Sequence, residues 1–266
     1  MERRLKINSA SKISNVPNSD PISFNHSLGR TDKNTFVLIE GAWYGGWVWD
    51  NVASALRELG HRVTSPTFTG LGERKHLVND TVNLSTHIED IVNHIEMEDL
   101  RGITLVGWSY GGMVIPSVVA RCSDRIKSLI YLDAFVPEDG KSVSDYYPVS
   151  EFLTLLEISK AENSPIPPLP LEFFEAATPE IVKFATPRIM TQPWRTFFEK
   201  VQIPSGVPRK PTSYIRCQRN GFPSFQAAAE RMEQDPQSRV VYLPVNHLCM
   251  LTHPKMLVDT LIELTE

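Results

Sequence analysis

The stretch Ile103-Thr104-Leu105-Val106-Gly107-Trp108-Ser109-Tyr110-Gly111-Gly112 decides the fold class of this chain. It begins with four apolar and β-branched residues, which are typical of a buried parallel strand, and it leads into a helix-like segment. The glycines two before and two after Ser109 remove side chains that would collide in a very tight strand-to-helix turn. Gly-x-Ser-x-Gly also occurs by chance in ordinary turns, but the strand before it and the helix after it favour a functional turn. This context predicts that the Ser109 hydroxyl stands above the sheet edge as a nucleophile, beside a helix N-terminus that stabilises negative charge.

Strand-like and helix-like segments alternate on both sides of this turn. The alternation predicts an α/β fold whose open, mostly parallel sheet is covered by helices on both faces. We expect strands at 35–39, 61–64, 103–106, 128–132, 214–217 and 239–243, and helices at 47–59, 84–98, 110–121, 224–232 and 254–264.

Two segments do not fit the alternation. Residues 1–34 are rich in Ser, Asn, Asp and Pro and are interpreted as a loose N-terminal extension. Residues 138–211 contain many prolines among short helical pieces and no strand signal, which predicts a helical cap inserted after the strand that ends near Asp133. The core would then consist of residues 35–137 and 212–266.

Composition limits the partners of the chain. A net charge of −4 over 266 residues argues against nucleic acid or an anionic membrane as the main partner. The three cysteines are scattered, which fits reduced thiols in a cytoplasmic protein and gives little support to a metal site. No apolar run is long enough to span a membrane, and the charged N-terminus lacks the apolar region of a secretory signal. We expect a monomer or homodimer.

His247 is the predicted general base, because Val245-Asn246-His247 follows the last expected strand and the carboxyl ends of parallel strands share one edge. The other histidines are given structural roles; His87 in particular is expected on a polar helix face. The acid that orients His247 has two candidates. Asn220 occupies the usual position after the penultimate strand, but an amide cannot stabilise imidazolium by charge, so we favour Asp133 at the end of the 128–132 strand.

The loop after the first strand, Glu40-Gly41-Ala42-Trp43-Tyr44-Gly45-Gly46-Trp47, is predicted to complete an oxyanion hole. Its glycines let the backbone approach a ligand closely. We expect the backbone N–H of Ala42 and that of Tyr110, the residue after the nucleophile, to be the two donors. Trp43, Tyr44 and Trp108 would form apolar walls of the substrate pocket.

Several motifs resemble bacterial α/β-hydrolase esterases, which are similar to plant hydroxynitrile lyases and methylesterases. They are Gly41-Ala42-Trp43 with Gly45-Gly46-Trp47, Thr67-Phe68-Thr69-Gly70-Leu71-Gly72-Glu73-Arg74, Thr86-His87-Ile88, Gly107–Gly112 and Tyr131-Leu132-Asp133-Ala134-Phe135-Val136-Pro137-Glu138-Asp139-Gly140. The resemblance implies an α/β-hydrolase fold with Ser109 and His247 in the active site and Ala42 and Tyr110 at the oxyanion positions. In that group histidine is common where this chain has Glu40, Tyr44 and Trp108. Glu40 is either a displaced structural carboxylate, which we prefer, or a substrate-facing acid.

These residues predict a serine hydrolase that cleaves a small, largely apolar carboxylic ester without a metal or organic cofactor. One alternative is a cofactor-free lyase that uses the same serine and histidine for proton transfer, since fold alone does not decide chemistry. The other is a non-catalytic small-molecule binder, against which the intact serine, histidine and glycines argue.

Overall fold

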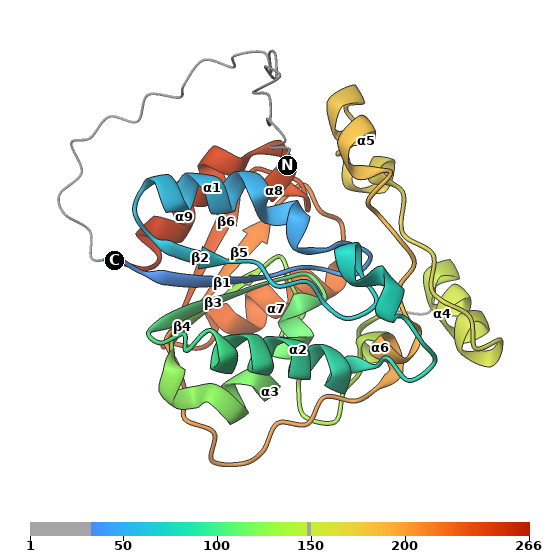
Figure 1. Ribbon diagram of the computed structural model, residues 1–266, viewed down its shortest axis with the longest axis horizontal. Helices are drawn as coiled ribbons and strands as arrows, with labels where there is room; N and C mark the ends of the chain where they lie inside the picture. Colours follow the sequence, from blue (N-terminus) through green and yellow to red (C-terminus); the bar gives the residue numbers. More distant parts are fainter. Residues whose placement is uncertain (1–32, 148–149) are drawn as a thin grey trace, which may run out of the picture. The chain divides into compact units, whose positions relative to one another are not determined.

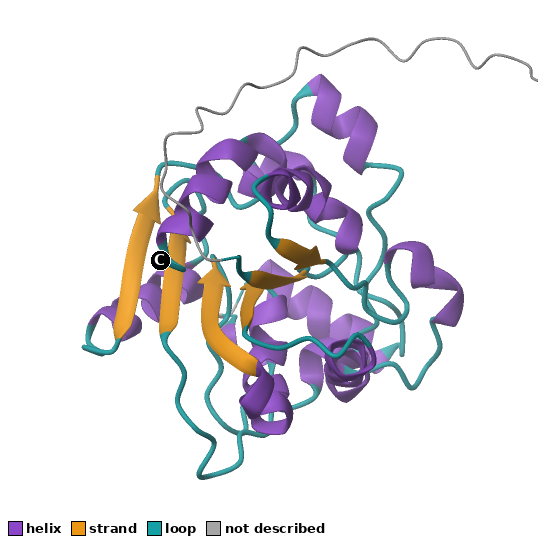
Figure 2. Cartoon of the chain, turned by 60° about the vertical axis from the view of Figure 1, so that its left-hand side comes forward, coloured by secondary structure: helices purple, strands orange, loops and turns teal. Residues whose placement is uncertain are grey.

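The computed structural model describes residues 33–147 and 150–266 (Figures 1 and 2). The extension expected at residues 1–34 therefore lies almost entirely outside the described residues. In the described part, no helix combines the length and the apolar character that crossing a membrane requires.

Six parallel strands form one sheet in the described chain, in the order β2-β1-β3-β4-β5-β6. The predicted parallel sheet is thus confirmed. The strands are β1 (Thr35–Ile39), β2 (Arg62–Thr64), β3 (Ile103–Trp108), β4 (Ile126–Leu132), β5 (Thr212–Cys217) and β6 (Ser238–Leu243).

Helices cover both faces of the sheet (Figures 1 and 2). In Figure 1, α1, α8 and α9 lie on one side, and α2 and α3 lie side by side on the other. A further helix, α7, packs on β5 and β6. The bounds of these helices are α1 (Asp50–Glu58), α2 (Leu84–Met97), α3 (Gly111–Cys122), α7 (Pro223–Glu233), α8 (Cys249–Thr252) and α9 (Pro254–Glu263). Every residue of the central strand β3 is buried, because a parallel strand covered on both faces has no solvent-facing side.

The described residues between β4 and β5 form three α-helices, two 3-10 helices and no sheet strand. The α-helices are α4 (Glu151–Ala161), α5 (Pro179–Ala185) and α6 (Arg195–Phe198), and the 3-10 helices are Val143–Tyr146 and Leu171–Phe174. An isolated antiparallel bridge joins Ile166 and Gln192, two segments of this region. The cap function that the sequence assigns to residues 138–211 stays a prediction.

Candidate active site

The predicted turn joins β3 to α3, and Ser109 is at its apex. Ser109 has a φ of 54°, a left-handed conformation that is strained for a residue with a side chain. The two glycines of the motif lie where a side chain would not fit. A Cβ atom would lie 2.7 Å from Ile115 Cδ1 at Gly107 and 2.7 Å from the Glu40 carbonyl oxygen at Gly111. The turn leaves Ser109 partly exposed between two buried neighbours.

His247 follows β6 and reaches the acid candidate that comes after β4. His247 Nδ1 lies 2.7 Å from Asp133 Oδ2, and both side chains are almost completely buried. Asn220 lies in the same cluster: its Nδ2 donates to Asp133 Oδ2 and is 3.0 Å from His247 Nδ1. The structure therefore brings both alternatives for the acid position together at one imidazole.

The hydrogen bonds around this cluster favour one tautomer of His247. If Nδ1 carried no proton, its lone pair would face the Asp133 carboxylate at 2.7 Å, which is repulsive. A proton on Nδ1 removes this conflict, because it is donated to Asp133. Asn220 keeps its amide nitrogen toward Asp133, since its Oδ1 accepts from the Phe222 N–H at 3.2 Å. The lone pair of Nε2 is then free to accept a proton from a nucleophile.

Asp133 is held from its other side by β5. Its Oδ1 accepts from Arg216 Nη1 at 2.7 Å and from the Cys217 N–H at 3.2 Å. Arg216 is absent from the sequence predictions. An arginine within the apolar run of β5 is nevertheless a usable signal, because a buried charge is almost always paired.

Trp108, the residue before Ser109, contacts His247. Trp108 Nε1 donates to the His247 carbonyl oxygen at 3.0 Å, and the two rings are 5.1 Å apart between centroids. Among the described residues, no hydrogen bond joins Ser109 Oγ and His247 Nε2. Such catalytic bonds often form fully only when substrate is bound.

The imidazole of His247 has aromatic surroundings. Its centroid is 5.2 Å from that of Phe174 and 5.4 Å from that of Phe225, and both rings are nearly parallel to it. Phe174 comes from the segment between β4 and β5, and Phe225 comes from α7. The segment predicted to be a cap therefore contacts the predicted base.

The predicted oxyanion donors lie on the two sides of Ser109. Tyr110 follows it directly, and the loop after β1 approaches it so closely that a Cβ atom on Gly41 would lie 3.0 Å from Ser109 Cβ. Within the described residues, the backbone N–H groups of Ala42 and Tyr110 have no hydrogen-bond partner. Two unpaired donors beside the serine are what an oxyanion hole requires.

His87 is buried and not on a polar face, so that prediction was wrong. Its Nε2 lies 3.1 Å from the Thr69 carbonyl oxygen, and its Nδ1 lies 3.0 Å from the Tyr110 hydroxyl. Burial lowers the pKa of His87 to about 4, so the ring is neutral, donates from Nε2 and accepts the Tyr110 proton. The helical spacing from Leu84 to Ile91 is the signal that places His87 on the buried face of α2.

The predicted pocket residues Glu40, Trp43, Tyr44 and Trp108 are all buried around the nucleophile turn. Glu40 Oε1 accepts from the Phe68 N–H at 2.7 Å. The Glu40 Oε2 atom and the Tyr44 hydroxyl have no partner in the described part of the chain. Burial raises the pKa of Glu40 to about 8, so its carboxyl group is mostly neutral at neutral pH.

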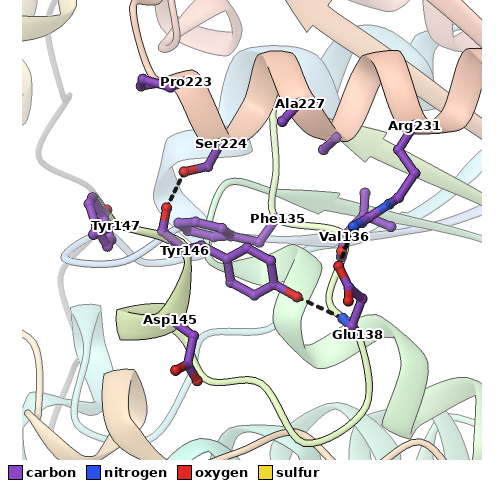
Figure 3. A pocket seen from close by; sticks show the side chains of 11 residues that line it. Phe135, Val136, Glu138, Asp145, Tyr146, Tyr147, Pro223, Ser224, Ala227 and Arg231 are labelled. Carbon is purple, nitrogen blue, oxygen red and sulfur yellow. Dashed lines mark hydrogen bonds and ion pairs between the residues drawn. The ribbon is translucent and has the colours of Figure 1, made fainter. Parts of the chain in front are cut away.

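A separate pocket of about 480 Å³ lies between α7 and the chain that follows β4 (Figure 3). Phe135 lines it and packs against Phe225, with 4.9 Å between ring centroids. The polar groups that line the pocket bind one another: Arg231 pairs with Glu138 at 2.7 Å, and the Glu138 N–H donates to the Tyr146 hydroxyl at 2.7 Å. Neither Ser109 nor His247 lines this pocket. In the described residues, no cluster of three or more His, Cys, Asp or Glu side chains could hold a metal ion.

Comparisons with known proteins agree with this geometry. A model of the alpha/beta hydrolase family matches residues 36–260. The carbendazim hydrolyzing esterase of Nocardioides sp. (strain SG-4G) is 36% identical over 236 residues, which are 85% of this chain and 97% of that protein. The alpha-hydroxynitrile lyase of Arabidopsis thaliana is 27% identical over 107 residues, or 40% of this chain and 42% of the lyase.

A solved structure is similar over nearly its full length. It is an extracellular alpha/beta-hydrolase from a Paenibacillus species, described as sharing structural and functional homology with tobacco salicylic acid binding protein 2. The TM-score is 0.72 at 28% identity, and the match covers 86% of this chain and 98% of the other. Together these similarities confirm the predicted resemblance to bacterial esterases and plant hydroxynitrile lyases.

Proposed function

This chain belongs to the alpha/beta hydrolase family, and we propose that it is a serine esterase that cleaves small, largely apolar carboxylic esters through an acyl-enzyme on Ser109. The observation that carries the proposal is the pairing of His247 Nδ1 with Asp133, which leaves Nε2 free at the sheet edge where Ser109 is partly exposed. The esterase relative supports a carboxylesterase-type hydrolase.

In the proposed mechanism His247 Nε2 takes the proton of Ser109 Oγ while that oxygen attacks the ester carbonyl carbon. Asp133 stabilises the imidazolium that forms. The N–H groups of Ala42 and Tyr110 donate to the oxyanion of the tetrahedral intermediate. When the intermediate collapses, the alcohol leaves with the proton from His247.

Deacylation repeats these steps with water. His247 removes a proton from a water molecule, whose oxygen attacks the acyl carbon bound to Ser109. The second tetrahedral intermediate uses the same two N–H donors, and its collapse returns the proton to Ser109 Oγ and releases the carboxylic acid. Every proton that moves is accounted for by Ser109, His247, water and the leaving alcohol, so these steps need no cofactor.

Apolar surroundings support an apolar ester as substrate. The side chains nearest His247 include Trp108, Phe174 and Phe225, and Trp43 and Tyr44 lie in the adjacent loop. We propose that residues 138–211 act as a cap over the 35–137 and 212–266 core, because Phe174 packs on His247 from that segment.

A cytoplasmic location is also part of the proposal. All three cysteines, Cys122, Cys217 and Cys249, are free and buried. Cys217 Sγ and Cys249 Sγ lie 3.9 Å apart without forming a disulfide, which suits a reducing compartment. The similar Paenibacillus hydrolase is described as extracellular, so cell fractionation is the direct test.

Replacement of Ser109 tests the proposed chemistry. We expect S109A to lower kcat by about 10⁵-fold or more on short p-nitrophenyl esters and on carbendazim, whichever the wild type turns over, with an unchanged Tm. A fluorophosphonate probe should label the wild type at Ser109 and leave S109A unlabelled. The matched control is Ser205→Ala, an exposed serine, which should behave as wild type.

Each other outcome contradicts a different part of the proposal. Turnover by S109A would disprove the acyl-enzyme on Ser109. Labelling of Ser109 without turnover of any ester would favour the proton-transfer chemistry of the lyase relative. Absence of labelling in folded wild-type protein would favour a non-catalytic binder.

A further inference from the structure

Arg216 is a buried cation directly behind the acid of the proposed catalytic site. It lies at the end of β5, next to the end of β4 where Asp133 begins the following loop. Only 4% of Arg216 is exposed, and the hydrogen bonds of its guanidinium all go to groups of the protein itself. A buried guanidinium is costly unless all its donors are used, so its contacts indicate what it does.

The contacts of Arg216 use every side of its guanidinium. Nη1 donates to Asp133 Oδ1 at 2.7 Å and also to the Cys217 carbonyl oxygen. Nη2 donates to the Asn220 carbonyl oxygen at 2.6 Å, and Nε donates to Gln226 Oε1 at 3.2 Å. The rigid fork of an arginine thus joins the end of β4, the loop after β5 and helix α7.

We propose that Arg216 is a positioning residue that acts on His247 through Asp133 and Asn220; this inference rests on the proposed esterase function. By binding Oδ1, Arg216 turns the carboxylate so that Oδ2 faces His247 Nδ1. By binding the Asn220 carbonyl, it fixes the loop from which the Asn220 amide donates to the same Oδ2. One cation therefore orients Asp133 and Asn220, the two side chains within hydrogen-bond distance of His247 Nδ1.

The charge of Arg216 has a second consequence. The Asp133–Arg216 pair carries no net charge, so it stabilises protonated His247 less than an isolated carboxylate would. Two other titratable side chains of β5 pack here and stay neutral. The pKa of Cys217 is raised well above its usual value by its contact with Cys249 and by burial, and burial raises that of Tyr214. Arg216 is thus the charged group that opposes Asp133 in this cluster.

The test is Arg216→Gln, which removes the charge and the fork at similar size. We expect kcat to fall by about 10- to 100-fold, because Asp133 and the Asn220 carbonyl each lose a hydrogen bond from the guanidinium. KM should stay within about twofold, since Arg216 touches no substrate. The acid limb of the kcat/KM profile should move to higher pH, because the negative charge of Asp133 then faces His247 without an opposing cation.

The matched control is Arg219→Gln, three residues further on. Arg219 is half-exposed and pairs with Glu175 at the surface, so its loss should change neither kcat nor the acid limb. Arg216→Lys keeps the charge but loses the fork, so kcat should lie between wild type and R216Q while the acid limb stays in place. The Lys variant also serves if R216Q does not fold.

Two results overturn the proposal. One is a kcat equal to that of the wild type in R216Q, or in R216K if R216Q does not fold. The other is an acid limb that does not move in R216Q, which would reduce Arg216 to a purely structural role. Fluorophosphonate labelling of the wild type keeps the two proposals apart: if Ser109 is labelled and S109A is inactive, the esterase function stands whatever Arg216 does.

Discussion

Glu40 is a carboxyl group that is completely buried directly after β1. Its neutral form explains how it is tolerated, because burial raises its pKa to about 8 and an uncharged group costs far less to bury. The carbonyl of Glu40 also packs against Gly111 of the nucleophile turn. The side chain of Glu40 accepts from the Phe68 N–H at 2.7 Å, a contact that fits the structural role we expect for it.

The raised pKa of Glu40 predicts a pH dependence of stability. Between the ordinary value of 4.5 and about 8, the folded protein keeps a proton that the unfolded chain has released. The Glu40 contribution is therefore fully present below pH 4.5 and is lost as the pH rises, by up to about 1.4 kcal/mol per unit, until about pH 8. Glu40→Gln should abolish this loss. The free energy of unfolding of the variant, measured in urea, should therefore rise relative to that of the wild type between pH 5 and pH 8.

The control for this prediction is Glu58→Gln, at an exposed glutamate of α1. Its free energy of unfolding should run parallel to that of the wild type across the whole range. A parallel curve for E40Q would instead mean that Glu40 is ionised in the fold.

At the scale of elements, the loop after β1 and the segment between β4 and β5 are fastened together at Trp43. Trp43 has a left-handed φ of 70°, and its backbone N–H donates to Gln192 Oε1 at 2.9 Å. Its indole N–H donates to the Ile166 carbonyl at 3.2 Å, and its carbonyl accepts from the Met190 N–H at 3.0 Å. These bonds fix the residue next to Ala42 and thereby the predicted oxyanion loop.

Gln192→Ala tests this connection. It leaves the buried Trp43 N–H without an acceptor, so we expect a loss of about 1–3 kcal/mol in the free energy of unfolding. Because Ala42 is adjacent, kcat on esters should fall as well. Gln202→Ala, at an exposed glutamine, should change stability by less than about 0.5 kcal/mol. A Q192A protein as stable as the wild type would show that the two elements do not depend on this contact.

At the scale of the whole molecule, the carboxyl edge of the sheet assembles the site from distant parts of the sequence. Asp133 and His247 are 114 residues apart, and Asp133 and Asn220 are 87 apart. Asp133 follows β4, Asn220 follows β5 and His247 follows β6. These three strands are adjacent in the sheet, so the loops at their carboxyl ends meet. Ligands in open parallel sheets bind at this edge for the same reason.

The roles of the two residues at His247 can be separated by mutation. Asp133→Asn should lower kcat by about 10³- to 10⁴-fold, because an amide does not stabilise imidazolium and disturbs the tautomer. Asn220→Ala should cost only about 10-fold, since one hydrogen bond to Asp133 is lost. Asp124→Asn, at an exposed carboxylate, is the control. A harmless D133N together with a crippled N220A would make Asn220 the residue on which His247 depends.

The sequence by itself determined the strand–turn–helix unit around Ser109, the succession of strands and helices along the chain, and the candidates Ala42, Tyr110 and His247. These are local properties: glycine spacing, apolar runs and positions at strand ends follow from sterics and burial along a few residues. His87 was predicted on a polar helix face, and only the structure placed it on the buried face of α2, beside the Tyr110 hydroxyl.

Only the tertiary structure decided which side chains meet. Asp133 and Asn220 were alternatives in the sequence, whereas in the fold both contact His247 and Arg216 holds both. The physical reason is that sheet register fixes which strand ends are adjacent, and strand ends far apart in sequence carry no local signal of their pairing. The charge balance at His247 is therefore a property of the fold, whereas the proposed nucleophile, Ser109, is indicated by the local sequence alone.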